Sequence, residues 1–188
     1  MNALQVGRRL EIATLSWNVA GVVVLAVAAW RAKSVALAGF GLDSVVEIGA
    51  STVVLWELAG VAQSRRHLAM KLIGASFVML AIYLAVQSSF VLALRFHPHH
   101  SPLGIIWTAM SALSMFTLAF HKSRVGNALA NPVLIAEGRI TFIDGVLATS
   151  VLIGLLLNAI AGWWWADPLT GFVIVYYAVQ EARESLAQ

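Results

Sequence analysis

The chain of 188 residues contains no cysteine and few charged residues. Without cysteine there is no disulfide framework and no thiolate metal site. The absence of cysteine also gives no indication of whether the protein resides in an oxidising or a reducing compartment. Charged residues make up only 11% of the chain, against about 25% in a soluble domain, whereas 60% of the residues are hydrophobic. A soluble chain of this size still leaves roughly 30% of its unfolded-state surface in water, which this composition cannot cover. Soluble enzymes, nucleic-acid modules and disordered chains are therefore excluded, and part of the solvent must be lipid.

The sequence also lacks two patterns that mark hydrolytic enzymes. Neither His-Glu-x-x-His nor Gly-x-Ser-x-Gly occurs anywhere in the chain. Nothing else in the sequence marks an enzymatic substrate, so we expect a protein that is not an enzyme.

Long apolar runs dominate what is present. A membrane-spanning helix needs about 20 mostly apolar residues. The N-terminal charges lie close to the first apolar run, and no clear cleavage pattern follows, so this run is interpreted as a span and not as a signal peptide. No connecting segment is long enough to form a separate domain. The sequence therefore predicts an all-α membrane protein, a single transmembrane domain over 1–188 with six helices at about 10–30, 34–60, 68–95, 103–121, 139–162 and 167–182.

The basic residues predict how the spans are oriented. Of the twelve Lys and Arg residues, three fall on one side of the predicted membrane (Arg31, Lys33 and Arg95). The other nine fall on the opposite side: Arg8, Arg9, Arg65, Arg66, Lys71, Lys122, Arg124, Arg139 and Arg183. The positive-inside rule then places both termini in the cytoplasm. The pI near 9.7 is thus a topology signal, and the expected partner is the lipid bilayer, with no nucleic acid.

Three acidic residues fall near the middle of the predicted membrane. Asp43 lies roughly 14 Å into the second span, Glu47 lies one turn deeper, and Asp144 lies roughly 18 Å from the cytoplasmic end of a fifth helix counted from Pro132. Each ionised carboxylate at this depth costs about 2.5–3.5 kcal/mol. We expect no Lys or Arg at the same depth, so these acids need either protons or a cation.

Two interpretations of these acids remain open. They form a site that binds protons and a divalent metal ion in turn, or they are permanently protonated and bond between helices or line a water cavity. An all-oxygen site suits Mg, Mn and Fe(II), and Zn accepts it too. Thr141 either joins the site as a ligand or second-layer partner of Asp144, or bonds back to its own helix. Asn18 is expected to bond between helices.

Two further groups of polar residues lie at the ends of the spans. An outward-facing loop after the third span either gathers or releases metal, or is only a polar turn; its histidines are His97, His99 and His100. Near the cytoplasmic ends, three glutamates either form an acidic path into the site or pair with interfacial arginines. The glutamates are Glu11, Glu57 and Glu137, and the arginines are Arg65, Arg66 and Arg139.

Two stretches of the chain resemble the cation diffusion facilitator family of transporters. The stretch 34–47, SVALAGFGLDSVVE, resembles the family's second helix, which carries two ligands four residues apart. The stretch 162–171, GWWWADPLTG, resembles its junction between helices five and six. The resemblance covers nearly the whole chain and implies a homodimeric, usually proton-coupled exporter of divalent metal ions with a tetrahedral site between helices two and five.

Carried over by position, the resemblance makes Asp43, Glu47 and Asp144 the metal ligands. The family's usual fourth ligand falls on Ile140, so Thr141 or water is the expected replacement. The family's soluble cytoplasmic domain has no counterpart, and the chain resembles a short branch with the layout of vesicular zinc transporters. The resulting hypothesis is a proton-coupled exporter of Zn, Mn or Fe in the plasma (inner) membrane. The alternative is a non-transporting interaction or accessory protein whose buried acids specify helix packing.

Overall fold

The computed structural model describes residues 3–32, 34–59, 63–95 and 99–186. Within these residues the chain is entirely α-helical, which confirms the predicted fold class. The helices are α1 (Ala3–Ala32), α2 (Val35–Leu58), α3 (Gln63–Leu94), α4 (Pro102–Leu129), α5 (Pro132–Ala161) and α6 (Ala166–Leu186).

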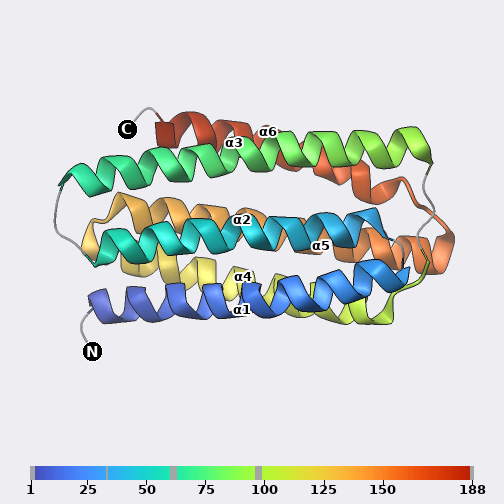
Figure 1. Ribbon diagram of the computed structural model, residues 1–188, viewed down its shortest axis with the longest axis horizontal. Helices are drawn as coiled ribbons and strands as arrows, with labels where there is room; N and C mark the ends of the chain where they lie inside the picture. The colour runs from blue at the N-terminus through green and yellow to red at the C-terminus, as the bar shows by residue number, and fades with distance from the viewer. Residues whose placement is uncertain (1–2, 33, 60–62, 96–98, 187–188) are drawn as a thin grey trace.

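The six helices lie lengthwise in three layers of two (Figure 1). The outer layers are α1 with α4 and α3 with α6, and the middle layer is α2 with α5. Helices α1, α2, α4 and α5 form a four-helix bundle, and the α3–α6 pair packs on the face made by α2 and α5. The helices of the middle layer are therefore the ones that can hold side chains away from both water and lipid.

Burial follows this layering. In the apolar segment of each helix, 56% of the residues of α2 and 61% of those of α5 are buried. The corresponding shares are 28% for α1, 33% for α3 and 28% for α4. The outer surface carries large apolar side chains such as Val23, Ile82 and Leu113, which are 60–73% exposed. Polar groups inside and apolar groups outside match a lipid solvent, and the chain is an integral, multi-pass membrane protein.

Among the residues that the structure describes, five helices, α1 to α5, are long and apolar enough to cross a membrane. Helix α6 is not among them. It nevertheless runs lengthwise beside α3 (Figure 1). Six membrane crossings thus stay a prediction.

Two helices extend beyond the predicted spans. Helix α4 continues from residue 121 to Leu129, and α5 begins at Pro132, the residue from which the depth of Asp144 was counted. The boundary is set by local chemistry, since Ala130 adopts a left-handed conformation and the Asn131 side chain accepts hydrogen bonds from the backbone N–H groups of Val133 and Leu134. Of the polar residues between the two predicted spans, Lys122, Asn131 and Glu137 face the interior.

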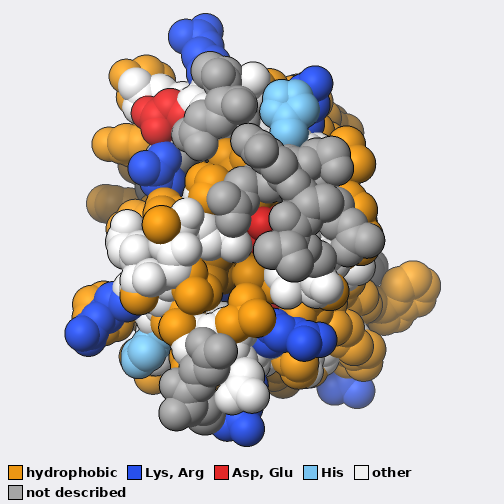
Figure 2. Space-filling view, turned by 90° about the vertical axis from the view of Figure 1, so that its left-hand side faces the viewer, with side chains coloured by type: hydrophobic (Ala, Val, Ile, Leu, Met, Phe, Trp, Pro, Cys, Tyr) orange, Lys and Arg blue, Asp and Glu red, His pale blue; other side chains and the backbone are white. Residues whose placement is uncertain are grey.

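Both termini lie at the same end of the bundle (Figure 1). Seen from that end, Lys and Arg side chains stand around the rim (Figure 2). Lys122 was expected among the basic residues at this end, but it is not a surface charge, because its side chain is completely buried. Without Lys122, basic residues are still in excess at the end with the termini, which favours cytoplasmic termini. This orientation stays a prediction.

Candidate functional site

The buried polar residues of α2 and α5 face each other across the middle layer. Helical periodicity places Asp43, Glu47 and Ser51 at successive four-residue steps on one face of α2. Glu137, Thr141 and Asp144 lie on the facing side of α5. All six are buried: Asp43, Glu47, Ser51, Glu137, Thr141 and Asp144.

Glu47 is the centre of this arrangement. Its Oε2 atom accepts a hydrogen bond of 2.8 Å from the Asn18 side chain of α1, which confirms that Asn18 bonds between helices. Its Oε1 atom accepts a hydrogen bond of 3.2 Å from the Thr141 hydroxyl. The carboxyl groups of Glu47 and Asp144 are also within hydrogen-bond reach of each other. Two carboxyl groups in contact need a shared proton or a cation between them.

Asp43 and Asp144 complete the group of acids predicted from the sequence. Asp43 is near enough to interact electrostatically with both Glu47 and Asp144. The Oδ2 atom of Asp144 is buried and has no hydrogen-bond partner among the described residues. The fold thus brings the three predicted ligands together, with one carboxylate oxygen still unused.

The acids do not form a ready-made coordination site in this conformation. Among the residues that the structure describes, no three His, Cys, Asp or Glu side chains are arranged to hold one metal ion. Each oxygen of Glu47 already accepts a hydrogen bond, from Asn18 or from Thr141, so about half of the lone pairs of this carboxylate are used. Their role as ligands stays a prediction.

Lys122 overturns the expectation that no cation lies near these acids. Its ammonium forms ion pairs with Glu137 Oε1 at 3.1 Å and with Glu11 Oε2 at 3.2 Å. It also donates a hydrogen bond of 3.0 Å to the Thr141 hydroxyl, which in turn donates to Glu47. The lysine projects inward because its position lies on the buried face of α4, and both carboxylates offset the cost of burying it.

The three glutamates near the termini are buried, and two of them share one buried cation. Glu11 and Glu137 pair with Lys122, and Ser51 donates a hydrogen bond of 3.1 Å to Glu137. Glu57 accepts a hydrogen bond of 3.0 Å from the Asn131 side chain, at the end of the bundle that carries the termini.

One of the arginines expected near these glutamates pairs with another acidic residue. Arg139 pairs with Glu184 at 3.0 Å on the surface, where both side chains are about half exposed. The side chains of Arg65 and Arg66 lie outside the described residues.

These contacts create a polar track through an otherwise apolar core. On α2 the track runs from Ser51 through Glu47 to Asp43, roughly 12 Å at 1.5 Å per residue. Glu57 lies six residues beyond Ser51, on a different face of α2. Ile140, at the position of the family's fourth ligand, is instead part of the buried apolar cluster. The track therefore follows one face of each central helix in the middle of the bundle.

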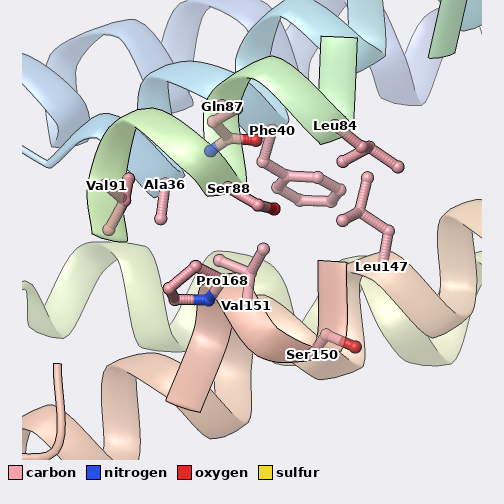
Figure 3. A pocket seen from close by; sticks show the side chains of 10 residues that line it. All are labelled: Ala36, Phe40, Leu84, Gln87, Ser88, Val91, Leu147, Ser150, Val151 and Pro168. Atoms are coloured by element: carbon pink, nitrogen blue, oxygen red, sulfur yellow. The ribbon is translucent and has the colours of Figure 1, made fainter. Parts of the chain in front are cut away.

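Beyond Asp43 the track is closed by apolar side chains. Phe40, Leu84 and Leu147 point toward one another from α2, α3 and α5 (Figure 3). The cavity that they line with Ser88 and others is only about 10 Å³, room for about one water molecule.

The two loop histidines that the structure describes are not part of the buried site. His99 and His100 are exposed just before α4, and the His99 backbone N–H donates a 3.0 Å hydrogen bond to the Ala32 carbonyl. His97 lies outside the described residues.

Two members of the track were missed as site residues, Lys122 and Ser51. The sequence did contain a signal for Lys122. Small or apolar residues recur at helical spacing along the buried face of α4, and Lys122 falls within this series. The series comprises Ser111, Met115, Ala119, Lys122 and Gly126. Ser51 lies one turn from Glu47, but a buried serine alone gives no comparable signal.

Comparison with known proteins gives one informative likeness. No protein-family model matches the chain. The chain is 24% identical over 180 residues to Transmembrane protein 163 of Xenopus laevis. The match covers 88% of this chain and 64% of the relative, so the chain spans just under two thirds of that protein's length. This likeness agrees with a membrane protein.

Proposed function

We propose that the chain is a transporter of a divalent metal cation, related to the cation diffusion facilitators, that exports its substrate in exchange for protons. The expected substrates are Zn, Mn or Fe(II), and the expected setting is a homodimer in the plasma (inner) membrane. The observation that carries the proposal is the contact of Glu47 with Asp144, beside Asp43, in the middle of an apolar bundle. Acids at this depth are costly and are typical of ion and proton pathways.

Proton competition supplies the coupling. A carboxylate must be deprotonated to bind metal, so metal binding at Asp43, Glu47 and Asp144 releases protons and protonation releases metal. Thr141 lies within 3.2 Å of Glu47 and is placed to hold that carboxylate or to replace it as a ligand.

Alternating access needs a movement of the helices around this fixed site. Phe40 and Leu147 close the side away from the termini, so release outward requires that α2 and α5 separate there. Rocking of one group of helices against another is the usual means in transporters with a central site.

The test is metal flux in proteoliposomes, with Zn, Mn, Fe(II), Co, Ni and Mg each supplied with and without a pH gradient. We expect flux of at least one metal that is faster with the gradient, and its loss in Asp144→Asn. Glu184→Gln is the matched control, since it removes one carboxylate from the exposed surface. A wild-type protein that moves none of these metals contradicts the proposal, and an active Asp144→Asn variant contradicts the site.

A second candidate function is a non-transporting accessory protein whose buried acids specify packing. The ion pairs of Lys122 with Glu11 and Glu137 favour it, because they join three helices without any metal. It predicts that Asp144→Asn lowers the folded yield and that no variant changes metal binding. Transport predicts instead that Asp144→Asn folds as well as wild type and loses metal.

A further inference from the structure

The ammonium of Lys122 lies where the four helices of the bundle meet. It donates hydrogen bonds to Glu137 and Thr141 of α5 at 3.1 and 3.0 Å, and it lies 3.2 Å from Glu11 Oε2 of α1 as an ion pair. Through Thr141 it is one hydrogen bond away from Glu47 of α2. A single cation is thus in contact with the polar track between the end that carries the termini and the predicted metal ligands.

The carboxylates around Lys122 have oxygen atoms that accept no hydrogen bond from the lysine. Glu11 and Glu137 are each fully buried, yet both carboxylate oxygens of Glu11 and Oε2 of Glu137 have no hydrogen-bond partner among the described residues. One ammonium also brings one positive charge to two carboxyl groups. These oxygens are the kind of ligand that a divalent cation takes.

We propose that Lys122 is a tethered cation that competes with the transported metal ion for the carboxylates of this track. This inference rests on the proposed transport function and assigns the lysine its role in it. The ammonium holds Glu11 and Glu137 while the track is empty, and it must withdraw before a divalent ion can bind there or pass to Glu47. Two cations cannot share these oxygens, because like charges at this separation repel strongly away from water.

The lysine side chain itself is suited to such a withdrawal, because its ammonium is carried on a flexible four-carbon stem. Because the lysine is covalently attached, it returns to the carboxylates as soon as the metal leaves. The device therefore favours release of the metal and keeps its affinity low.

Charge removal at Lys122 should tighten metal binding. If the ammonium holds the track about nine-tenths of the time, its loss lowers the apparent Kd about tenfold. We expect Lys122→Met in the full chain to bind Zn²⁺ about tenfold more tightly by isothermal titration, with a lower KM and a slower turnover in proteoliposomes. Lys122→Arg keeps the charge and should stay near wild type. Lys71→Met, which removes an exposed lysine of α3, is the matched control and should change neither constant.

The double variant Lys122→Met/Glu11→Gln guards against misfolding. It removes the lysine together with one buried negative charge, so fewer uncompensated acids remain. Tighter Zn²⁺ binding by either variant supports the inference. Unchanged Kd and KM, with only a smaller folded fraction, would mean that Lys122 is a structural residue and would overturn it while leaving transport intact. A wild-type protein that neither binds nor moves Zn²⁺ or the other metals overturns both proposals.

Discussion

The Thr141 hydroxyl donates a 3.2 Å hydrogen bond to Glu47 on the neighbouring helix and not to a carbonyl of its own helix. The same oxygen accepts a hydrogen bond from Lys122 at 3.0 Å. Of the two roles that the sequence left open for this threonine, back-bonding to α5 is thus wrong. Thr141 instead joins the cation of α4 to the carboxylate of α2.

Thr141→Val should therefore weaken both the fold and the site. Valine has the same shape but cannot bond to Glu47 or Lys122, and interhelical hydrogen bonds of this kind are worth roughly 0.5–2 kcal/mol. We expect a loss of that size in unfolding free energy, measured by titration with a denaturing detergent. Thr149→Val is the control, because the Thr149 hydroxyl donates to the Gly145 carbonyl of the same helix. Equal losses in the two variants would show that the Glu47 contact contributes nothing.

The close approach of α4 and α5 depends on Gly138. A Cβ atom there would lie 2.8 Å from Ser123 Oγ and 3.2 Å from the Ser123 backbone nitrogen. Gly138→Ala should push the helices apart and cost about 1–3 kcal/mol. It should also move Lys122 away from Glu137, which lowers metal flux. Thermal unfolding and proteoliposome assays measure the two effects.

Gly49→Ala is the control for this change. Gly49 lies on the exposed face of α2, and a Cβ atom added there would meet no neighbouring atom within 4 Å. Alanine at this position should therefore leave stability unchanged or raise it by about 0.5–1 kcal/mol. A Gly138→Ala variant as stable as Gly49→Ala would contradict the packing argument.

The central acids were predicted from the sequence, whereas the cation beside them was missed. Asp43 and Glu47 interrupt an apolar run at a spacing that places both on one helix face, so depth and direction follow from counting residues. Lys122 lies just beyond an apolar run that hydropathy ends at residue 121, which made it resemble a surface charge. Its burial depends on the length of α4, and that length is decided by the turn at Ala130 and Asn131.

The partners of the other glutamates could not be predicted either, for a related reason. Which cation Glu11 and Glu137 meet depends on how α1, α4 and α5 are rotated about their axes. Glycines set part of that rotation, since Gly138 and Gly145 let Ser123 and Phe116 of α4 pack against the α5 backbone. Charge order along the chain contains no such information, and it favoured the arginines at the ends of the helices.

Asn131 has two separable roles. Its Oδ1 atom caps α5 by accepting from the backbone N–H groups of Val133 and Leu134, and its Nδ2 group donates to Glu57. Asn131→Ser keeps a capping oxygen and loses the amide donor, whereas Asn131→Ala loses both. We expect Asn131→Ala to cost about 0.5–2 kcal/mol more than Asn131→Ser in unfolding free energy. If the two variants unfold alike, the cap does not stabilise α5.

The absence of cysteine makes the membrane topology directly testable. Single cysteines at His100, Arg124, Trp163 and Glu184 occupy exposed positions at the two ends of the bundle. Six crossings with cytoplasmic termini predict that a membrane-impermeant maleimide labels positions 100 and 163 on intact cells. Positions 124 and 184 should be labelled only after permeabilisation. Labelling of 184 together with 163 from outside would mean that α6 does not cross, and reversal of all four would mean that the positive-inside rule has given the wrong orientation.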